Sequence, residues 1–189
     1  MSPLNYWKIL KQEMVYENPF IRFRVDEVVG PDGKPRNINV TNTGNSNIII
    51  PISKEGLFYI IKQWRHPRNY YSWEFPGGRS DGTETPIETG MRELKEESRL
   101  VSKSWKLLGS LDLLSGLSEN TYDILLAEDV SKIESTETGH NEDGVEEIRA
   151  VTFAELVELI GNGIKNAQSI AALMLYLSQP GVMKKHILD

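Results

Sequence analysis

The position of the first helix signal is the feature that most constrains the fold of this chain. The sequence shows no helix start before Thr85. Strand patterns fill the earlier part: residues 21–29 alternate, and a Gly/Pro turn at 30–35 leads into a returning strand at about 36–41. Later helices are too few and too unevenly placed for regular β-α-β units, so the order of elements predicts an α/β (α+β) fold with a mixed sheet flanked by helices. The other expected elements are strands at about 48–52, 57–64, 105–114, 121–127 and 147–151, and helices starting at 85 and covering about 153–161 and 167–177.

A polar break at residues 43–46 suggests two parts. Residues 1–45 are expected to form an N-terminal antiparallel strand element, and residues 46–189 the main domain. A chain of 189 residues is long enough for one sizeable domain with a small appended element.

Composition narrows the function classes. Cysteine is absent, which excludes disulfides and thiolate metal sites. The net charge is −6 with no basic stripe, so nucleic acid is not an expected partner. No apolar run is long enough to span a membrane and the first residues do not form a signal peptide, so a cytoplasmic location without membrane partners is expected. An acidic protein that handles phosphates needs an intermediary cation.

The first helix has a well-marked start. Thr85 can serve as the N-cap, Pro86 suits the first helical position, and Glu88 completes a capping box with Thr85. The apolar residues that form its expected buried stripe are Ile87, Met91 and Leu94.

Three carboxylates cluster on this helix. At about 100° per residue, Glu93, Glu96 and Glu97 fall within roughly a third of a turn of one another, away from the apolar stripe. Their repulsion is expected to be offset in part by Arg92, through Glu88 and Glu96. A divalent cation could neutralise the rest, and Mg²⁺ or Mn²⁺ prefers carboxylate oxygens. A solvated acidic face is the alternative for three glutamates taken alone.

The glutamates belong to a longer register that resembles the Nudix box of the Nudix hydrolases. The residues in register are Gly78, Glu84, Arg92, Glu93, Leu94, Glu96, Glu97 and Leu100. Arg99 stands where the pattern has glycine. The resemblance implies a Nudix α/β/α sandwich with a mixed sheet and hydrolysis of a diphosphate bond.

Further runs resemble the ADP-ribose pyrophosphatase branch of that family, and the likeness covers roughly residues 7–178. Ser115 departs from it by replacing a proline. The runs that carry the resemblance are residues 16–20, 63–67, 73–78, 115–119 and 166–173.

The resemblance also implies roles in metal binding. Glu93 and Glu97 would be the principal metal ligands, with Glu96 beside them, and a carbonyl near Gly77 would add an oxygen. Arg92 would orient the glutamates rather than touch substrate; its alternative is a plain helix salt bridge.

A base and substrate contacts are implied as well. In the acidic loop at residues 141–147, Glu146 and Glu142 are the candidates for a base or an extra metal ligand, and the alternative is a solvated loop. Arg65 resembles a phosphate-contacting arginine, and a solvated surface arginine is its alternative. The expected substrate-binding residues are Arg65, Glu74, Ser118 and Glu119.

The sequence therefore predicts Mg²⁺-dependent hydrolysis, with Mn²⁺ as a possible substitute. The substrate would be ADP-ribose or a related nucleoside diphosphate sugar, and the products a nucleoside monophosphate and a sugar phosphate. A Nudix enzyme for nucleoside triphosphates and a catalytically silent ligand-sensing module are the alternatives. The resemblance also implies a homodimer whose N-terminal strands pack on the partner.

Overall fold

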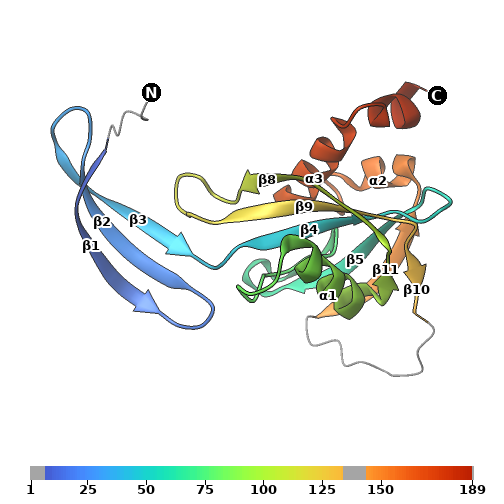
Figure 1. The fold of residues 1–189 in the computed structure, drawn as a ribbon, viewed down its shortest axis with the longest axis horizontal. Helices are drawn as coiled ribbons and strands as arrows, with labels where there is room; N and C mark the ends of the chain where they lie inside the picture. Colours follow the sequence, from blue (N-terminus) through green and yellow to red (C-terminus); the bar gives the residue numbers. More distant parts are fainter. Residues whose placement is uncertain (1–6, 134–143, 189) are drawn as a thin grey trace. The chain divides into compact units, whose positions relative to one another are not determined.

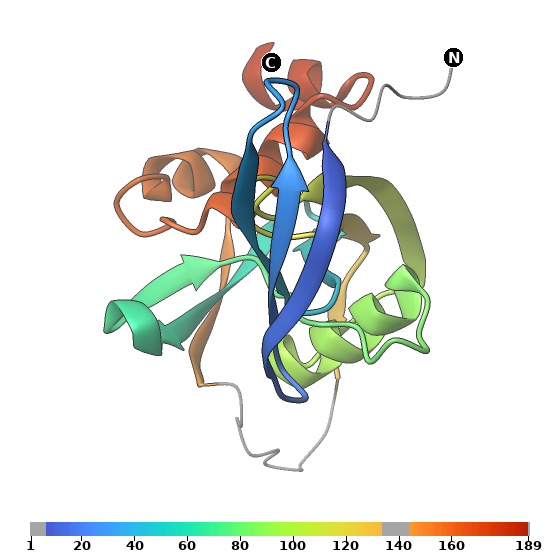
Figure 2. The same cartoon turned by 90° about the vertical axis from the view of Figure 1, so that its left-hand side faces the viewer.

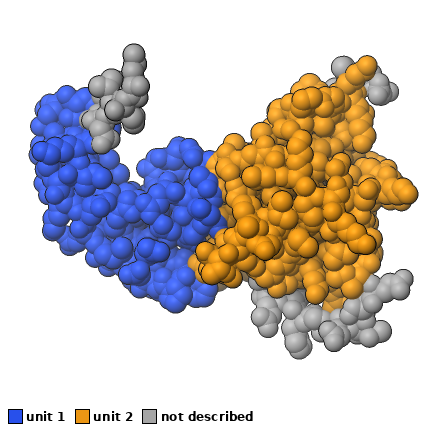
Figure 3. All heavy atoms as spheres, in the orientation of Figure 1, with its two compact units in different colours: residues 1–45, 112–121 blue, residues 46–111, 122–189 orange. Residues whose placement is uncertain are grey.

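The computed structural model describes residues 7–133 and 144–188. The chain forms two compact units (Figure 3). Unit 1 comprises residues 1–45 and 112–121, and unit 2 comprises residues 46–111 and 122–189. The expected N-terminal strand element is thus grouped with the segment that contains Ser118 and Glu119.

Unit 1 is built on a three-stranded antiparallel sheet in the order β1-β2-β3. The strands are β1 (Lys8–Glu17), β2 (Arg22–Val29) and β3 (Pro35–Asn42), shown side by side in Figures 1 and 2. The sequence predicted β2 and β3 but missed β1. The pairing of β1 with β2 shifts register twice, so its side chains do not follow the strict alternation by which a strand is recognised.

The strands of unit 2 form a mixed arrangement, as the sequence predicts. In one sheet, of order β4-β9-β8, β4 and β9 are parallel. In a second, of order β11-β5-β6, all pairs are antiparallel. A short antiparallel pair, β7-β10, completes the set. The strands are β4 (Ser46–Pro51), β5 (Phe58–Arg65), β6 (Tyr70–Glu74), β7 (Leu100–Val101), β8 (Ser104–Asp112), β9 (Thr121–Glu128), β10 (Ser131–Lys132) and β11 (Val145–Val151).

Helices cover both sides of these strands in unit 2. Helix α1 (Pro86–Ser98) lies on one side, and α2 (Phe153–Leu159) and α3 (Ala167–Leu177) lie on the other (Figure 1). A short 3₁₀ turn, η1 (His66–Arg68), joins β5 to β6, and a π-helical turn, η2 (Lys184–Leu188), follows α3. The predicted fold class is confirmed. Within the described residues, no helix has the length and apolar character needed to cross a membrane.

The core of unit 2 has an apolar layer on each side of the strands. On the α1 side, Ile49 and Leu125 pack with Leu94 of the helix. On the other side, the ring of Phe58 lies 6.1 Å from Phe153 of α2 and 5.8 Å from Tyr176 of α3, measured between centroids. Burial on both faces explains why β4 and β9 are nearly continuous apolar runs.

Candidate active site

Helix α1 begins and ends as its sequence predicts. The Thr85 hydroxyl accepts a hydrogen bond from the Glu88 N–H at 3.3 Å, and the Glu88 carboxylate accepts one from the Thr85 N–H at 2.8 Å. The capping box is therefore confirmed. At the other end Arg99 has φ 53° and ψ 29°, the left-handed conformation, and its N–H donates to the Lys95 carbonyl at 3.0 Å.

The buried face of α1 differs from the predicted stripe. Leu94 is fully buried and Ile87 packs against the same cluster, but Met91 is 49% exposed. The helix instead packs through Gly90, where an added Cβ would lie only 2.4 Å from a methyl carbon of Leu125. At this turn of α1, Gly90 and not Met91 is therefore the residue that lies against the sheet.

Two of the three glutamates lie on this buried face, and not away from it as the sequence predicted. Glu93 is 8% exposed and Glu97 is 6% exposed, whereas the side chain of Glu96 is 52% exposed. The buried positions of α1 come in pairs one turn apart: 89–90, 93–94 and 97–98. Two carboxylates one turn apart on a buried face require strong compensating interactions.

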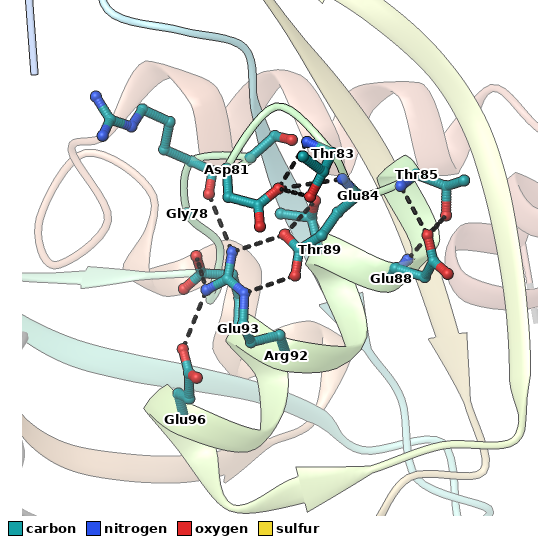
Figure 4. Close-up of polar contacts among 12 residues, drawn as sticks. Gly78, Asp81, Thr83, Glu84, Thr85, Glu88, Thr89, Arg92, Glu93 and Glu96 are labelled. Carbon is teal, nitrogen blue, oxygen red and sulfur yellow. Dashed lines mark hydrogen bonds and ion pairs between the residues drawn. The ribbon is translucent and has the colours of Figure 1, made fainter. Parts of the chain in front are cut away.

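Arg92 compensates much of this charge (Figure 4). Its Nη1 atom donates to Glu93 at 2.8 Å and to Glu96 at 3.1 Å, and its Nε and Nη2 atoms bind both oxygens of Glu84 at 2.9 and 3.0 Å. Glu88 is not the partner that the sequence predicted, because the capping box holds its carboxylate at Thr85. The hydrogen bond to Glu84, above all, raises the pKa of Arg92, so the guanidinium stays charged.

The segment before the helix approaches the glutamates through two glycines. An added Cβ at Gly78 would lie 2.3 Å from the carboxyl carbon of Glu93, and one at Gly77 would lie 2.2 Å from the Asn47 carbonyl oxygen. Only glycine fits at either position without displacing its neighbour.

The orientation of Gly77 follows from the pairing of this segment with β4. The carbonyls of Pro76 and Gly78 accept hydrogen bonds from β4, at 2.8 Å each. In an extended segment, alternate residues direct their N–H and C=O groups to opposite edges. Gly77 therefore directs both groups away from β4, and its N–H donates to Glu97 Oε2 at 2.9 Å. By the same alternation, the Gly77 carbonyl is expected to point away from β4.

A residue of the sheet also binds the Glu97 carboxylate. Gln63, a buried residue of β5, donates from Nε2 to Glu97 Oε1 at 3.4 Å. Each oxygen of this carboxylate thus has a donor on a different element, which fixes the plane of the group.

Arg65 and Glu74 form a bidentate pair across the β5–β6 hairpin. The Nε and Nη2 atoms of Arg65 donate to Oε1 and Oε2 of Glu74 at 2.9 and 2.5 Å. Glu74 is buried, whereas the Arg65 side chain is 43% exposed. The hydrogen bond to Glu74 raises the pKa of Arg65, and the charge of Glu97 contributes in the same direction. Arg65 is therefore anchored by Glu74.

Two family models match this chain. The NUDIX domain model matches residues 44–173, and a second model, the nucleoside diphosphate sugar hydrolase N-terminal domain, matches residues 7–37. The chain belongs to the Nudix family. As a Nudix hydrolase it acts on pyrophosphate bonds.

Relatives and a solved structure span most of the chain. The ADP-ribose pyrophosphatase of Bacillus subtilis is 25% identical over 153 residues, which are 81% of this chain and 82% of that protein. The ADP-ribose pyrophosphatase of Mycobacterium tuberculosis is 25% identical over 192 residues, 97% of this chain and 92% of that protein. A crystal structure of an ADP compounds hydrolase matches with a TM-score of 0.79 at 20% identity, covering 96% of this chain and all of that one. This likeness identifies the Nudix fold.

The donor set of this Nudix site suits a divalent metal, on which the family generally depends. In residues 7–133 and 144–188, no three His, Cys, Asp or Glu side chains form a compact metal-binding group by themselves. Glu93 and Glu97 are nevertheless buried carboxylates one turn apart, and the Gly77 N–H donates to Glu97. Mg²⁺ is commonly bound through one or two carboxylates and completes its shell with water and phosphate oxygens. The chemistry of these oxygen donors therefore suits a divalent cation.

Of the two candidate bases, the structure describes only Glu146. Glu142 lies outside the described residues. Glu146, on β11, forms an ion pair with Lys62 at 2.6 Å. Glu146 is the extra residue of a β-bulge, since Val145 pairs with Gln63 and Glu147 pairs with Lys62.

Ser118 and Glu119, expected to bind substrate, belong to unit 1. The Glu119 carboxylate accepts from Asn42 at 2.6 Å and from Arg24 at 2.8 Å, and these bonds lower the pKa of Glu119. The Ser118 hydroxyl donates to Asn120 at 3.0 Å. The Glu119 side chain thus joins the β8–β9 connection to β2 and β3, whereas the Ser118 bond stays within that connection.

The sequence assigned no role to two residues that the structure brings to the site, Gln63 and Asn166. Both stood inside runs that resemble the family. A buried amide in an apolar strand was the available signal for Gln63. Asn166, the N-cap of α3, donates to Glu74 at 2.9 Å.

Proposed function

We propose that this Nudix hydrolase cleaves the diphosphate bond of ADP-ribose or a related nucleoside diphosphate sugar in the presence of Mg²⁺. The products would be a nucleoside monophosphate and a sugar phosphate. The observation that carries the proposal is the buried pair Glu93 and Glu97 packed against Gly77 and Gly78. The names of the two pyrophosphatase relatives and of the N-terminal domain model support the substrate class.

Glu93, Glu97 and the Gly77 carbonyl would hold the metal, with Glu96 at the exposed edge. A bound Mg²⁺ supplies positive charge to the phosphoryl oxygens and lowers the pKa of a water nucleophile. Gly77 and Gln63 keep the Glu97 carboxylate in one plane, so it need not reorganise when charge develops. Arg92 holds Glu93 and Glu96 in place without itself touching substrate.

Arg65 would contact a phosphate of the substrate. Its Nε–Nη2 edge is bound to Glu74, and the partly exposed guanidinium is planar and always charged, which suits phosphate oxygens.

Hydrolysis forms a bond from the water oxygen to phosphorus and breaks the bond between that phosphorus and the bridging oxygen. One proton of the water must leave, and Glu142 and Glu146 are the candidates to accept it. For Glu146 this requires release of its ion pair with Lys62, because that pair engages its carboxylate.

A homodimer is part of the proposal. Strand β1 is exposed along its whole length, and its apolar residues lie on both faces of a three-stranded sheet. The exposed large apolar side chains of this strand are Ile9, Leu10, Met14, Val15 and Tyr16. A second copy would remove this surface from water.

Two further parts complete the proposal. Ser118 and Glu119 would contact substrate in the complete enzyme. The enzyme would be located in the cytoplasm, which cell fractionation can test.

A substrate panel tests the activity. ADP-ribose, other nucleoside diphosphate sugars and nucleoside triphosphates would each be incubated with Mg²⁺, with Mn²⁺ and with a chelator, and the products separated by chromatography. ADP-ribose should yield AMP and ribose 5-phosphate only when metal is present. Faster turnover of triphosphates would favour the triphosphatase alternative. Binding without turnover of any compound would favour a silent sensing module.

A further inference from the structure

The N-terminus of α3 is fastened to the strand that leads into the site. Asn166 accepts a hydrogen bond from the Ser169 N–H at 2.8 Å, which caps the helix, and the Ser169 hydroxyl accepts one from the Phe75 N–H at 3.0 Å. The second arm of the same amide, Asn166 Nδ2, donates to Glu74 Oε2 at 2.9 Å. One side chain thus serves both the helix and the carboxylate that anchors Arg65.

Glu74 needs this donor because it is buried. The residue is 2% exposed, and a carboxylate removed from water must have its lone pairs satisfied. Arg65 binds one edge of the group through two bonds, and Asn166 adds a third bond at Oε2. With three donors on two elements, the carboxylate plane is fixed, and so is the plane of the guanidinium bonded to it.

Arg65 has no comparable support from burial, since 43% of its side chain is exposed. A long, half-exposed arginine loses considerable rotamer entropy when it is held in one geometry. Its orientation therefore depends on Glu74. Because Glu74 in turn depends on Asn166, a change at the start of α3 is transmitted to the Arg65 guanidinium.

We propose that Asn166 is a positioning residue that sets the orientation of Arg65 through Glu74 and so strengthens binding of the substrate diphosphate. The inference rests on the proposed function, in which Arg65 contacts a phosphate. The chemistry requires an amide, because the cap uses an acceptor and Glu74 uses a donor. Serine supplies only the cap, and aspartate supplies the cap but places a second carboxylate against Glu74.

This difference defines the experiment. ADP is the probe, and its affinity for the full chain is measured by calorimetry in Mg²⁺ for the parent, Asn166→Ser, Asn166→Asp and Arg65→Ala. Thr152→Ala is the matched control, because Thr152 caps α2 in the same way but does not contact Glu74. Thermal denaturation of every variant separates loss of capping from loss of binding.

We expect Asn166→Ser to weaken ADP binding about three- to tenfold, the range for loss of one hydrogen bond, and Asn166→Asp to weaken it further. Thr152→Ala should lower the melting temperature without changing ADP affinity. Asn166→Ser should have no additional effect on ADP affinity in the Arg65→Ala background, because the two residues act in one chain of contacts. KM should rise in Asn166→Ser while kcat changes less.

If Asn166→Ser binds ADP like the parent while Arg65→Ala binds it more weakly, the positioning role of Asn166 is wrong and the proposed function is unaffected. Parent-like affinity in Arg65→Ala would overturn both the phosphate contact in the proposed function and the positioning role that depends on it. A parent chain that binds no ADP would contradict the proposed function itself.

Discussion

Gly77 donates its backbone N–H to Glu97 at 2.9 Å, which ties the C-terminal half of helix α1 to the segment that precedes the helix. The carbonyl of the same residue, Gly77, is proposed as a metal ligand. One glycine therefore supplies one proposed oxygen ligand and orients another, the Glu97 carboxylate. A backbone donor has no rotamer freedom of its own, and the carboxylate is therefore oriented before any ligand arrives.

Glu97→Gln tests this carboxylate directly. The amide is nearly the same size, so the fold should survive, but the variant loses a negative charge at the metal. We expect kcat to fall by about 10² or more. The rate is measured at limiting and saturating Mg²⁺, and Mn²⁺ affinity is followed by electron paramagnetic resonance. Parent-like rates at limiting Mg²⁺ would show that the helix is not the metal site.

Gly78→Ala should displace Glu93, because the new Cβ would lie 2.3 Å from its carboxyl carbon. We expect metal affinity to fall by about tenfold or more, within the range for losing a properly oriented metal site. Gly109→Ala is the control, since its new Cβ meets only the end of the Leu175 side chain, at 3.3 Å. Equal Mn²⁺ affinity in the two variants would remove Glu93 from the ligand set.

Glu146→Gln and Glu142→Gln test the base. The residue that accepts the proton should affect turnover, so its variant should have a lower kcat and nearly unchanged substrate affinity. If Glu146 is that residue, Lys62→Met should change the pH dependence of kcat, because it removes the cation that holds the carboxylate 2.6 Å away. Should neither glutamine variant slow hydrolysis, the loop is a solvated segment.

Val15→Asp tests the dimer. The side chain is 56% exposed in the single chain, so an aspartate there should be tolerated by the monomer fold. Buried against a second copy, an unpaired carboxylate would be costly, and we expect the variant to dissociate. Molar mass from light scattering decides the question. A parent chain that is already monomeric would refute the dimer.

The strands of the fold were predictable where they alternate or are buried on both faces, as in β2 and β4. Strand β1 was missed because its two register shifts interrupt the alternation. Strand β6 was missed because it has five residues and follows a turn that depends on a left-handed Asn69, with φ 55°. A short aromatic run after such a turn carries too little periodicity to be distinguished from a loop.

Helical geometry alone predicts part of the site. Spacing alone brings Glu93, Glu96 and Glu97 together, but it does not show which of them are buried. That depends on the contact of Gly90 with β9, which no local pattern records. The bond between Asn166 and Glu74 joins residues 92 positions apart, so only the fold reveals it.

Arg99→Gly should have a small effect. Glycine removes the cost of a left-handed arginine, about 1 kcal/mol, but it also adds freedom to the unfolded chain and removes a positive charge at the helix C-terminus. We expect the free energy of unfolding to change by no more than about 1 kcal/mol and kcat to stay within a few-fold. Chemical denaturation and steady-state kinetics check this. A large loss of activity would mean that Arg99 acts on substrate.

The left-handed Arg99 also bears on how such enzymes are found in genomes. The backbone at this position needs a conformation, not a residue type, and the exposed arginine adopts it while its N–H still closes the last turn on Lys95. A search pattern that demands glycine here would reject this chain although its glutamates are in register. Patterns for the box should therefore weight the carboxylates, whose chemistry has no substitute, above the helix-terminating position, where an alternative costs little.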